Sequence, residues 1–403
     1  MPPGSVRHDG GVSGTAPATG RLVGIDLARF VALAGMMGAH TLSWGETPPA
    51  AIVALVDGPP STLFAVLGGV SVVLAARARL AAGDGGGALR ATLVRGLVVA
   101  LLGVLVAPLA PAVYVVLVPF GVAIALCGLL LRAPAWVLAA LAAAIALGGG
   151  SVVAAAGAHL PSLRRISREL SPVESLVPAL NDVLLTGVYP ALVWLGYLLI
   201  GMLVGRGLLA AQAAGRERAM LLRLAAIGAI ATGVGIVLSE LGVALLTETI
   251  APGEPALARE VLLANGYGAV AADPLAGGDA LLWQLLAAPH TGTPADVART
   301  AGIALVVIAL LGLAVQRLSP RALRALEPVR AAGGAPLTVY IVHVLLLSVL
   351  GGLLQDAPGL AGGWGAWAMH VVIALALGAL LAAAGQRGPF ERLVGWCAER
   401  AAR

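Results

Sequence analysis

The stretch LVGIDLARFVALAGMMGAHTLSW, residues 22–44, decides the fold class. It exceeds the roughly 20 apolar residues that a helix needs to span a bilayer, yet it carries Asp26, Arg29 and His40. It is too long for the core of a signal peptide and ends without a small-residue cleavage site. We therefore expect it to stay in the mature protein as the first membrane-spanning helix.

The composition of the rest of the chain indicates the same class. Of the 403 residues, 59% are hydrophobic and 11% are charged, whereas an average soluble domain has about 25% charged residues. The apolar runs are long and continuous, which excludes the ten-residue alternation of a membrane barrel. We predict an all-α, polytopic integral membrane bundle of about ten transmembrane helices, with the N-terminus and the C-terminus cytoplasmic.

The distribution of arginine orients this bundle. The predicted spans are 22–44, 58–76, 92–109, 113–131, 134–156, 186–208, 220–247, 299–316, 333–354 and 364–385. All 25 basic residues are arginine, and alternating spans put all but six of them on one side. Apart from Arg29 inside the first span, the exceptions are Arg164, Arg165, Arg168, Arg259 and Arg299. The arginine-rich side is cytoplasmic by the positive-inside rule, and arginines placed in this way do not indicate a nucleic-acid partner.

The domain organisation follows from these spans. We predict a disordered cytoplasmic tail over residues 1–20, a transmembrane domain over 21–395 and a short cytoplasmic tail over 396–403. Two long connections, 157–185 and 248–298, fall on the outer side. Such loops either meet a substrate or merely cap the bundle, and the sequence leaves both roles open.

Charged residues inside the first span point to a functional stripe. Asp26 and Arg29 are three residues apart, so they share a helix face and can pair. Arg29 and His40 lie on one face about 16 Å apart along the axis. Arginine binds phosphate or carboxylate, and imidazole can take a proton from a hydroxyl group. The alternatives are a structural ion pair for Asp26 and Arg29, and a core histidine bonded to a backbone carbonyl for His40.

Further polar residues recur in later spans. In PLTVYIVH, residues 336–343, Tyr340 and His343 share a face, either as a ligand site or as a hydrogen bond between helices. His290, Thr293, Glu240 and His370 are expected near the depth of His40, where they could orient it or relay its protons. No metal motif, phosphate-binding loop or serine elbow occurs, so we expect chemistry by histidine, arginine and carboxylate without a metal.

Several motifs resemble one family. Arginine followed by ten residues and histidine in GIDLARFVALAGMMGAH is similar to the opening of membrane-bound acyltransferases. The chain as a whole resembles bacterial heparan-alpha-glucosaminide N-acetyltransferase-like proteins of a transmembrane acyltransferase superfamily. Besides this opening, the likeness is carried by STLFAVLGGVS at 61–71, Tyr189-Pro190 with Trp194 to Arg206, PHTGTP at 289–294, PLTVYIVH and RGPFE at 387–391. One departure is Gly58-Pro59-Pro60, where the family pattern has a basic residue.

The resemblance implies a function. An acyl group, expected to be acetyl, passes from cytoplasmic acyl-CoA to an envelope carbohydrate or lipid-linked sugar on the outer side of the bacterial cytoplasmic (inner) membrane. By this likeness His40 is catalytic and Arg29 and Asp26 belong to its motif. Tyr340 and His343 fall in a second characteristic stretch, and His290, Thr293 and Glu240 are candidates for binding substrate. We expect Arg77 and Arg95 to attract the negatively charged CoA.

Two other functions remain open at this point. A transporter or flippase could use the same Asp/Arg/His stripe to carry a solute or a proton. A noncatalytic membrane subunit could keep the helices alone. The sequence also leaves open the acyl group, the acceptor and whether the chain forms a homo-oligomer.

Overall fold

The structure is a computed structural model, and it describes residues 20–42, 48–111, 113–163, 172–263, 278–353 and 362–403. All regular elements in these ranges are helical, which confirms the predicted all-α class. The expected tail, residues 1–20, lies outside the described residues except for Gly20. Arg164, Arg165 and Arg168 of the first outer loop also lie outside them.

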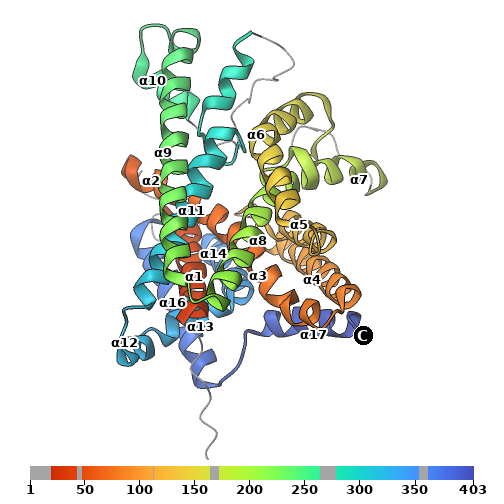
Figure 1. The fold of residues 1–403 in the computed structure, drawn as a ribbon. Coiled ribbons are helices and arrows are strands. Elements are labelled where there is room, and N and C mark those ends of the chain that lie inside the picture. Colours follow the sequence, from red (N-terminus) through yellow and green to blue (C-terminus); the bar gives the residue numbers. More distant parts are fainter. Residues whose placement is uncertain (1–19, 43–47, 112, 164–171, 264–277, 354–361) are drawn as a thin grey trace, which may run out of the picture.

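The described helices follow one another along the chain as Figure 1 shows. In the first half they are α1 (Gly20–Thr41), α2 (Ala50–Val56), α3 (Pro59–Ala81), α4 (Gly85–Val106), the 3-10 turn η2 (Ala107–Leu109), α5 (Leu117–Leu129), α6 (Ala135–His159), α7 (Pro172–Asn181), the π-helical turn η4 (Asp182–Thr186) and α8 (Ala191–Ala213). In the second half they are α9 (Glu217–Ile250), α10 (Pro255–Leu262), the 3-10 helix η6 (Gly278–Leu285), α11 (Pro294–Val315), α12 (Pro320–Ala325), α13 (Glu327–Gly334), α14 (Pro336–Leu353), α16 (Gly363–Ala383) and α17 (Pro389–Ala401).

The membrane-spanning helices match the predicted runs closely. Within the described residues, 9 helices are long and apolar enough to cross a membrane by length and composition. The remaining predicted span, 113–131, is the apolar helix α5, which has only 13 residues. At 1.5 Å per residue α5 is about 20 Å long, shorter than the roughly 30 Å of a hydrocarbon core. The chain is therefore a polytopic helical membrane bundle.

Several boundaries differ from the expected ones because local signals start or stop a helix. α11 begins at Pro294 and not near 299, because Thr293 caps it by accepting a hydrogen bond from the Asp296 amide at 3.1 Å. Arg299, expected in a connection, is therefore inside a span. The predicted span 333–354 is divided by Pro336, which separates α13 from α14.

Both predicted outer loops and the end of the chain contain helices. α7 forms in the described part of 157–185, and α10 and η6 form in the described part of 248–298. Residues 396–403, expected as a tail, are helical as far as Ala401 in α17. Arg90 of α4 donates to the carbonyl oxygens of Ala401 and Ala402 at 3.0 and 3.1 Å, so this segment is bound to the bundle.

Close helix packing depends on glycine. A Cβ atom on Gly69 of α3 would lie 1.9 Å from the Leu198 carbonyl oxygen of α8, and one on Gly201 of α8 would lie 1.9 Å from the Val66 oxygen. Gly228 of α9 and Gly302 of α11 meet in the same way. Glycine thus allows close approach between these membrane helices.

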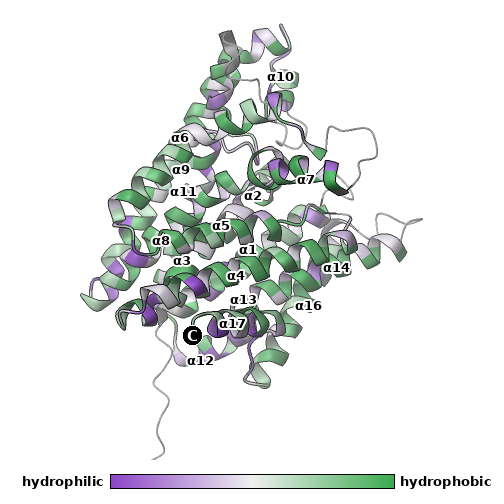
Figure 2. Ribbon diagram, turned by 90° about the vertical axis from the view of Figure 1, so that its right-hand side faces the viewer, coloured by the Kyte–Doolittle hydropathy of each residue, from purple (hydrophilic) through white to green (hydrophobic). Residues whose placement is uncertain are grey.

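The bundle consists of two groups of helices. One contains α1, α9, α11, α13, α14 and α16, and the other contains α3, α4, α5, α6, α8 and α17 (Figure 1). Contacts of α1 and α11 with α3 join the groups. Hydrophobic residues cover most of the length of the long helices (Figure 2). Exposed side chains such as Leu97, Leu101, Ile230 and Val237 suit a lipid environment.

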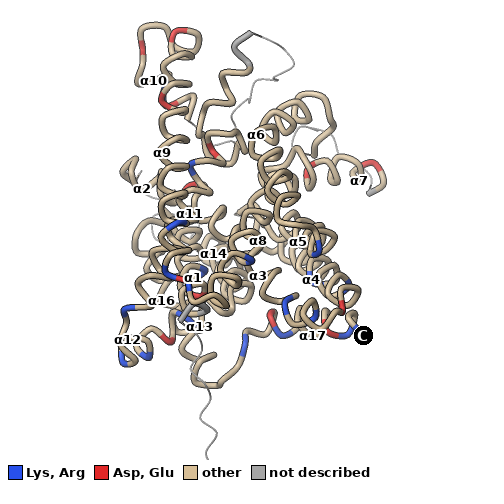
Figure 3. The backbone as a smooth tube through the Cα atoms, in the orientation of Figure 1, with Lys and Arg blue, Asp and Glu red and all other residues tan. Residues whose placement is uncertain are grey.

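Charged residues gather at the two ends of this bundle (Figure 3). Most arginines lie at the end that carries α12, α17 and the turn between α8 and α9, here called the arginine-rich end. Acidic residues are prominent at the opposite end, around α7 and α10. This separation is the pattern that the alternating spans predicted.

Candidate functional site

The ion pair predicted on α1 is present. Arg29 Nη1 lies 2.5 Å from Asp26 Oδ1, and Arg29 Nη2 donates to Ser71 Oγ of α3 at 2.9 Å. Arg330 of α13 approaches the other Asp26 oxygen at 3.7 Å. Both Asp26 and Arg29 side chains are 15% exposed, so the pair is largely removed from solvent. Asp26 holds the guanidinium in place and Ser71 orients it.

Arg29 also lines a cavity with a volume of about 280 Å³. This cavity lies between the two groups of helices and is lined by residues of α1, α3, α4, α5, α14 and α17. Arg95 and Arg387 add two further guanidinium groups to its wall, while Phe64, Leu67 and Phe120 make the wall apolar. We call it the arginine cavity. A long ligand with an anionic end and an apolar arm suits such a surface.

Of the two arginines that the sequence analysis expected to attract CoA, one lines the arginine cavity and the other does not. Arg95 lies in its wall, whereas Arg77 is exposed near the end of α3 and is not among the lining residues. Arg387 was quoted only as part of the RGPFE motif, and its position at the cavity was not expected. Its proximity to Arg29 depends on tertiary contacts across more than 350 residues, which no local pattern reveals.

Two of the quoted motifs meet beside this cavity. Glu391 of RGPFE accepts hydrogen bonds from the backbone amides of Leu337 and Thr338 at 2.7 and 3.1 Å and from Thr338 Oγ1 at 2.6 Å. A carboxylate at the N-terminus of α14 satisfies otherwise unpaired amides and interacts favourably with the helix dipole. Glu391 therefore joins PLTVYIVH to α17, which forms part of the cavity wall.

His40 belongs to a cluster of three imidazoles. His40 Nδ1 lies 3.0 Å from His343 Nε2, and the two rings are nearly parallel at 3°, with centroids 5.2 Å apart. The His343 ring in turn meets the His370 ring edge to face at 4.7 Å. His343 and His370 are only 3% and 1% exposed. The cluster thus brings together α1, α14 and α16 inside the bundle.

Tyr340 does not join this cluster. Its hydroxyl accepts a hydrogen bond from the Val116 amide at 3.4 Å, although Tyr340 and His343 share α14. The predicted alternative of a Tyr–His hydrogen bond is therefore wrong, because the ring turns toward the segment before α5. Tyr340 is 2% exposed and links helices at that point.

The PHTGTP segment holds His290 at the opposite end of the bundle from α17. His290 has φ of 64°, a left-handed conformation that non-glycine residues adopt uncommonly. Its Nε2 lies 2.9 Å from Asp57 Oδ1. Thr293 Oγ1 donates to the Leu286 carbonyl at 2.5 Å, and Gly292 donates to Asp296 Oδ2 at 3.2 Å. These bonds hold the loop rigidly, and Thr293 acts as a helix cap.

A small polar pocket of about 20 Å³ lies against His290. Its lining includes Ser61, Thr62, Tyr189 and Asp296. Asp296 is 2% exposed, and its Oδ1 has no hydrogen-bond partner among the described residues, although Arg299 lies 3.7 Å away. We call this the His290 pocket. Its size suits a single hydroxyl or amine group, and its hydroxyl and carboxylate groups could bind one.

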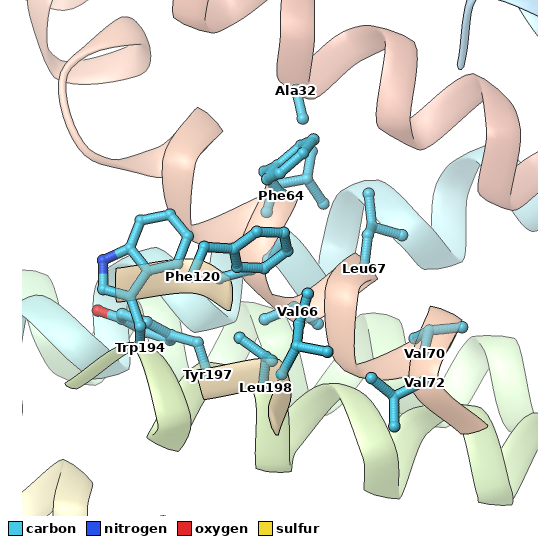
Figure 4. Packing of buried hydrophobic residues seen from close by; sticks show 14 of the residues in the cluster. Ala32, Phe64, Val66, Leu67, Val70, Val72, Phe120, Trp194, Tyr197 and Leu198 are labelled. Carbon is cyan, nitrogen blue, oxygen red and sulfur yellow. The ribbon is translucent and has the colours of Figure 1, made fainter. Parts of the chain in front are cut away.

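A row of aromatic rings runs between the two cavities. Phe64 and Phe120 of the arginine cavity have centroids 5.2 Å apart, and Phe120 meets Trp194 at 5.6 Å. Trp194 meets Tyr189 at 5.7 Å, and Tyr189 meets His290 at 5.2 Å. Figure 4 shows Phe64, Phe120 and Trp194 packed together in the core. The row separates the arginine cavity from the His290 pocket.

The other candidates occupy separate places. Glu240 is half-exposed on α9, where its carboxylate accepts two hydrogen bonds from Arg259 at 2.6 and 2.7 Å, and it lines neither cavity. In the described ranges, no group of three or more His, Cys, Asp or Glu residues is arranged to hold a metal ion.

The fold and these groups together define a polytopic membrane protein with histidine and arginine side chains in its interior. Residues 21–235 match the family described as heparan-alpha-glucosaminide N-acetyltransferase, catalytic. The match covers more than half of the chain, and the chain belongs to this family. It includes Arg29, His40 and Arg95, whereas His290, His343 and Arg387 lie beyond it. No curated protein and no solved structure matches the chain.

Proposed function

We propose that the protein is a membrane-bound acyltransferase. It moves an acetyl group from cytoplasmic acetyl-CoA to an envelope sugar or glycolipid on the outer side of the bacterial cytoplasmic membrane. The observation that supports this most directly is the arrangement of α1. This single helix places Arg29 in the arginine cavity and His40 in a partly buried imidazole pair nearer the opposite end. Membership of an acetyltransferase family supports the same reaction.

The arginine cavity is the proposed donor site. Arginine binds phosphate groups bidentately, and Arg29, Arg95 and Arg387 line this cavity. The apolar wall formed by Leu67 and Phe120 fits the arm that carries the thioester. Arg77 lies outside the cavity, and it would contribute to the positive charge of the surface through which CoA approaches.

The His290 pocket is the proposed acceptor site. It lies at the end opposite the arginine-rich one, which is the outer side if the arginine-rich end is cytoplasmic. Its volume of about 20 Å³ holds the reacting group and not a whole sugar ring. The rest of an acceptor would therefore remain outside the pocket.

The proposed chemistry needs one base. His40 takes the proton from the acceptor hydroxyl or amine while the acceptor oxygen or nitrogen bonds to the thioester carbonyl carbon. The carbon–sulfur bond then breaks, and the leaving CoA thiolate takes the proton from the His40 imidazolium, which restores the base. A positioned general base accelerates such a step by roughly 10²–10⁴-fold. Burial keeps water away from the thioester.

The test is transfer of radiolabelled acetyl from acetyl-CoA by the purified protein in nanodiscs, with extracted envelope glycolipids as acceptors. His40→Ala should lower the rate by at least about 10²-fold. His159→Ala, at an exposed position at the end of α6, is the control and should keep the wild-type rate. Full activity of His40→Ala would remove His40 from the mechanism. If the wild type neither binds nor turns over acetyl-CoA, the acyltransferase proposal fails and the transporter hypothesis gains.

A further inference from the structure

Two buried nitrogens of the histidine cluster have no protein partner. His343 Nδ1 and His370 Nε2 are both enclosed, and neither makes a hydrogen bond to any described residue. An unpaired buried polar atom costs free energy, so such atoms usually bind water. The two nitrogens belong to rings that touch, which suggests one shared partner.

The space for that partner is present. A cavity of about 10 Å³ is lined by His343 and His370 together with apolar side chains such as Met37 and Leu346. This volume is at the lower limit for one water molecule, and a buried water needs at least two polar neighbours. The two unpaired nitrogens are such neighbours.

The backbone defines the protonation of His370. Its Nδ1 lies 2.8 Å from the carbonyl oxygen of Ala366, one helical turn earlier. A carbonyl oxygen only accepts, so Nδ1 must carry the hydrogen. An imidazolium buried at 1% exposure would need a carboxylate, and none of the described ion pairs includes His370. His370 is therefore neutral, and its Nε2 is an acceptor.

We infer that one water molecule bridges His343 Nδ1 and His370 Nε2, and that this bridge sets the tautomer of His40. The water donates to His370 Nε2 and accepts from His343 Nδ1–H. His343 Nε2 then accepts from His40 Nδ1–H across the 3.0 Å contact. His40 Nε2 is left unprotonated, which is the form that a general base requires. His343 and His370 are positioning residues in this arrangement.

The opposite orientation of the bridging water, in which it donates to both nitrogens, is less favourable. A water that donates to both histidines would interrupt the single direction of the chain, because His343 Nδ1 and His370 Nε2 would both accept from it. It would also put the hydrogen of His343 on Nε2 and that of His40 on Nε2, which removes the base. Hydrogen bonds that run in one direction polarise and strengthen one another. The one-way chain from His40 to the Ala366 carbonyl has this property.

The catalytic role of this water bridge rests on the proposed function. The positions of the ring hydrogens can be tested directly without any measurement of activity. Solid-state nitrogen NMR of the full chain labelled with ¹⁵N-histidine in nanodiscs distinguishes protonated from unprotonated ring nitrogens. We expect His40, His343 and His370 all to carry hydrogen on Nδ1. Hydrogen on Nε2 of His40 or of His343 would overturn the inference, whether or not acetyl transfer is observed.

A kinetic series tests the catalytic role. His370→Phe keeps the ring shape without an acceptor, and it should lower kcat about tenfold, the scale of one hydrogen bond, with KM for acetyl-CoA unchanged. His370→Gln restores an oxygen acceptor near the Nε2 position and should recover most of that loss. Ser348→Ala, on the helix α14 that carries His343 but outside the cluster, is the control and should keep the wild-type kcat. Equal losses for His370→Phe and His370→Gln would show that His370 acts only through packing.

Discussion

His290 shows how a single residue can be held in place for a task. Its left-handed backbone and its 2.9 Å contact with Asp57 keep the ring at the His290 pocket. Strained conformations of this kind persist where the surrounding structure enforces them, and they are frequent at functional sites. Here the enforcing contacts are the bonds of Thr293 and Gly292 within the PHTGTP loop.

Removing the carboxylate beside His290 should affect the acceptor alone. Asp57→Ala frees the imidazole to leave the pocket, so we expect KM for the acceptor to rise about 10–100-fold, the range for hydrogen bonds to charged groups. Hydrolysis of acetyl-CoA without acceptor should not change. Glu254→Ala, an exposed acid near α10, is the control. A higher KM for acetyl-CoA instead would mean that the His290 pocket belongs to the donor.

Arg387 allows the converse test on the donor side. Its guanidinium lines the arginine cavity, so Arg387→Ala should weaken binding of CoA about tenfold through loss of one charge-assisted phosphate contact. Isothermal titration with CoA measures this directly. Arg324→Ala, exposed on α12, should leave the affinity unchanged. Equal loss in both variants would indicate general attraction by positive charge, with no specific site.

The spacing of residues on α1 predicted the contact within that helix but not the contacts with other helices. The pairing of Asp26 with Arg29 follows from a separation of three on a helix, and it is present. The partners Ser71 and His343 are 42 and 303 positions from Arg29 and His40, respectively. Helical periodicity contains no information about such distant contacts. The proposed roles of the site residues stay predictions.

At the scale of helices, glycine determines how closely α3 and α8 approach. Gly69→Ala would place a methyl group 1.9 Å from a backbone oxygen of α8, which cannot move as a side chain can. We expect the free energy of unfolding to fall by about 1–3 kcal/mol or more, as for overpacked cores. A thermal melt in detergent should show a lower Tm.

Gly233 provides the matched control for this change. It lies on α9, and a Cβ atom there would meet nothing within 4 Å. Gly233→Ala should therefore keep or slightly raise the Tm, because alanine favours a helix by up to about 1 kcal/mol. If both variants melt at the same temperature, the close contact between α3 and α8 is not important for stability.

Helix identities were easier to predict than helix ends. Apolar length alone locates the spans, since each must cover a similar thickness of hydrocarbon. Boundaries depend on caps and prolines that act within one turn, as at Thr293 and Pro336. The helices α7, α10 and α17 are short or amphipathic and were missed, because hydropathy over a long window does not detect them.

At the scale of the whole molecule, the two cavities and the aromatic row imply a divided interior. The arginine cavity lies on one side of Phe120 and Trp194, and the His290 pocket lies on the other. The thioester must therefore extend past this row before an acceptor in the His290 pocket can attack it. A closed row would limit loss of the thioester to water while no acceptor is bound.

The division is meaningful only if the arginine-rich end faces the cytoplasm, where CoA is made. Single cysteines in a background without Cys127 and Cys397 can test this in intact cells. Ala214→Cys lies in the exposed turn between α8 and α9, and Glu254→Cys lies beside α10 at the opposite end. A membrane-impermeant maleimide should label the Glu254→Cys variant in intact cells and the Ala214→Cys variant only after lysis. The reverse pattern would place the arginine cavity outside, and cytoplasmic acetyl-CoA could then not be the donor.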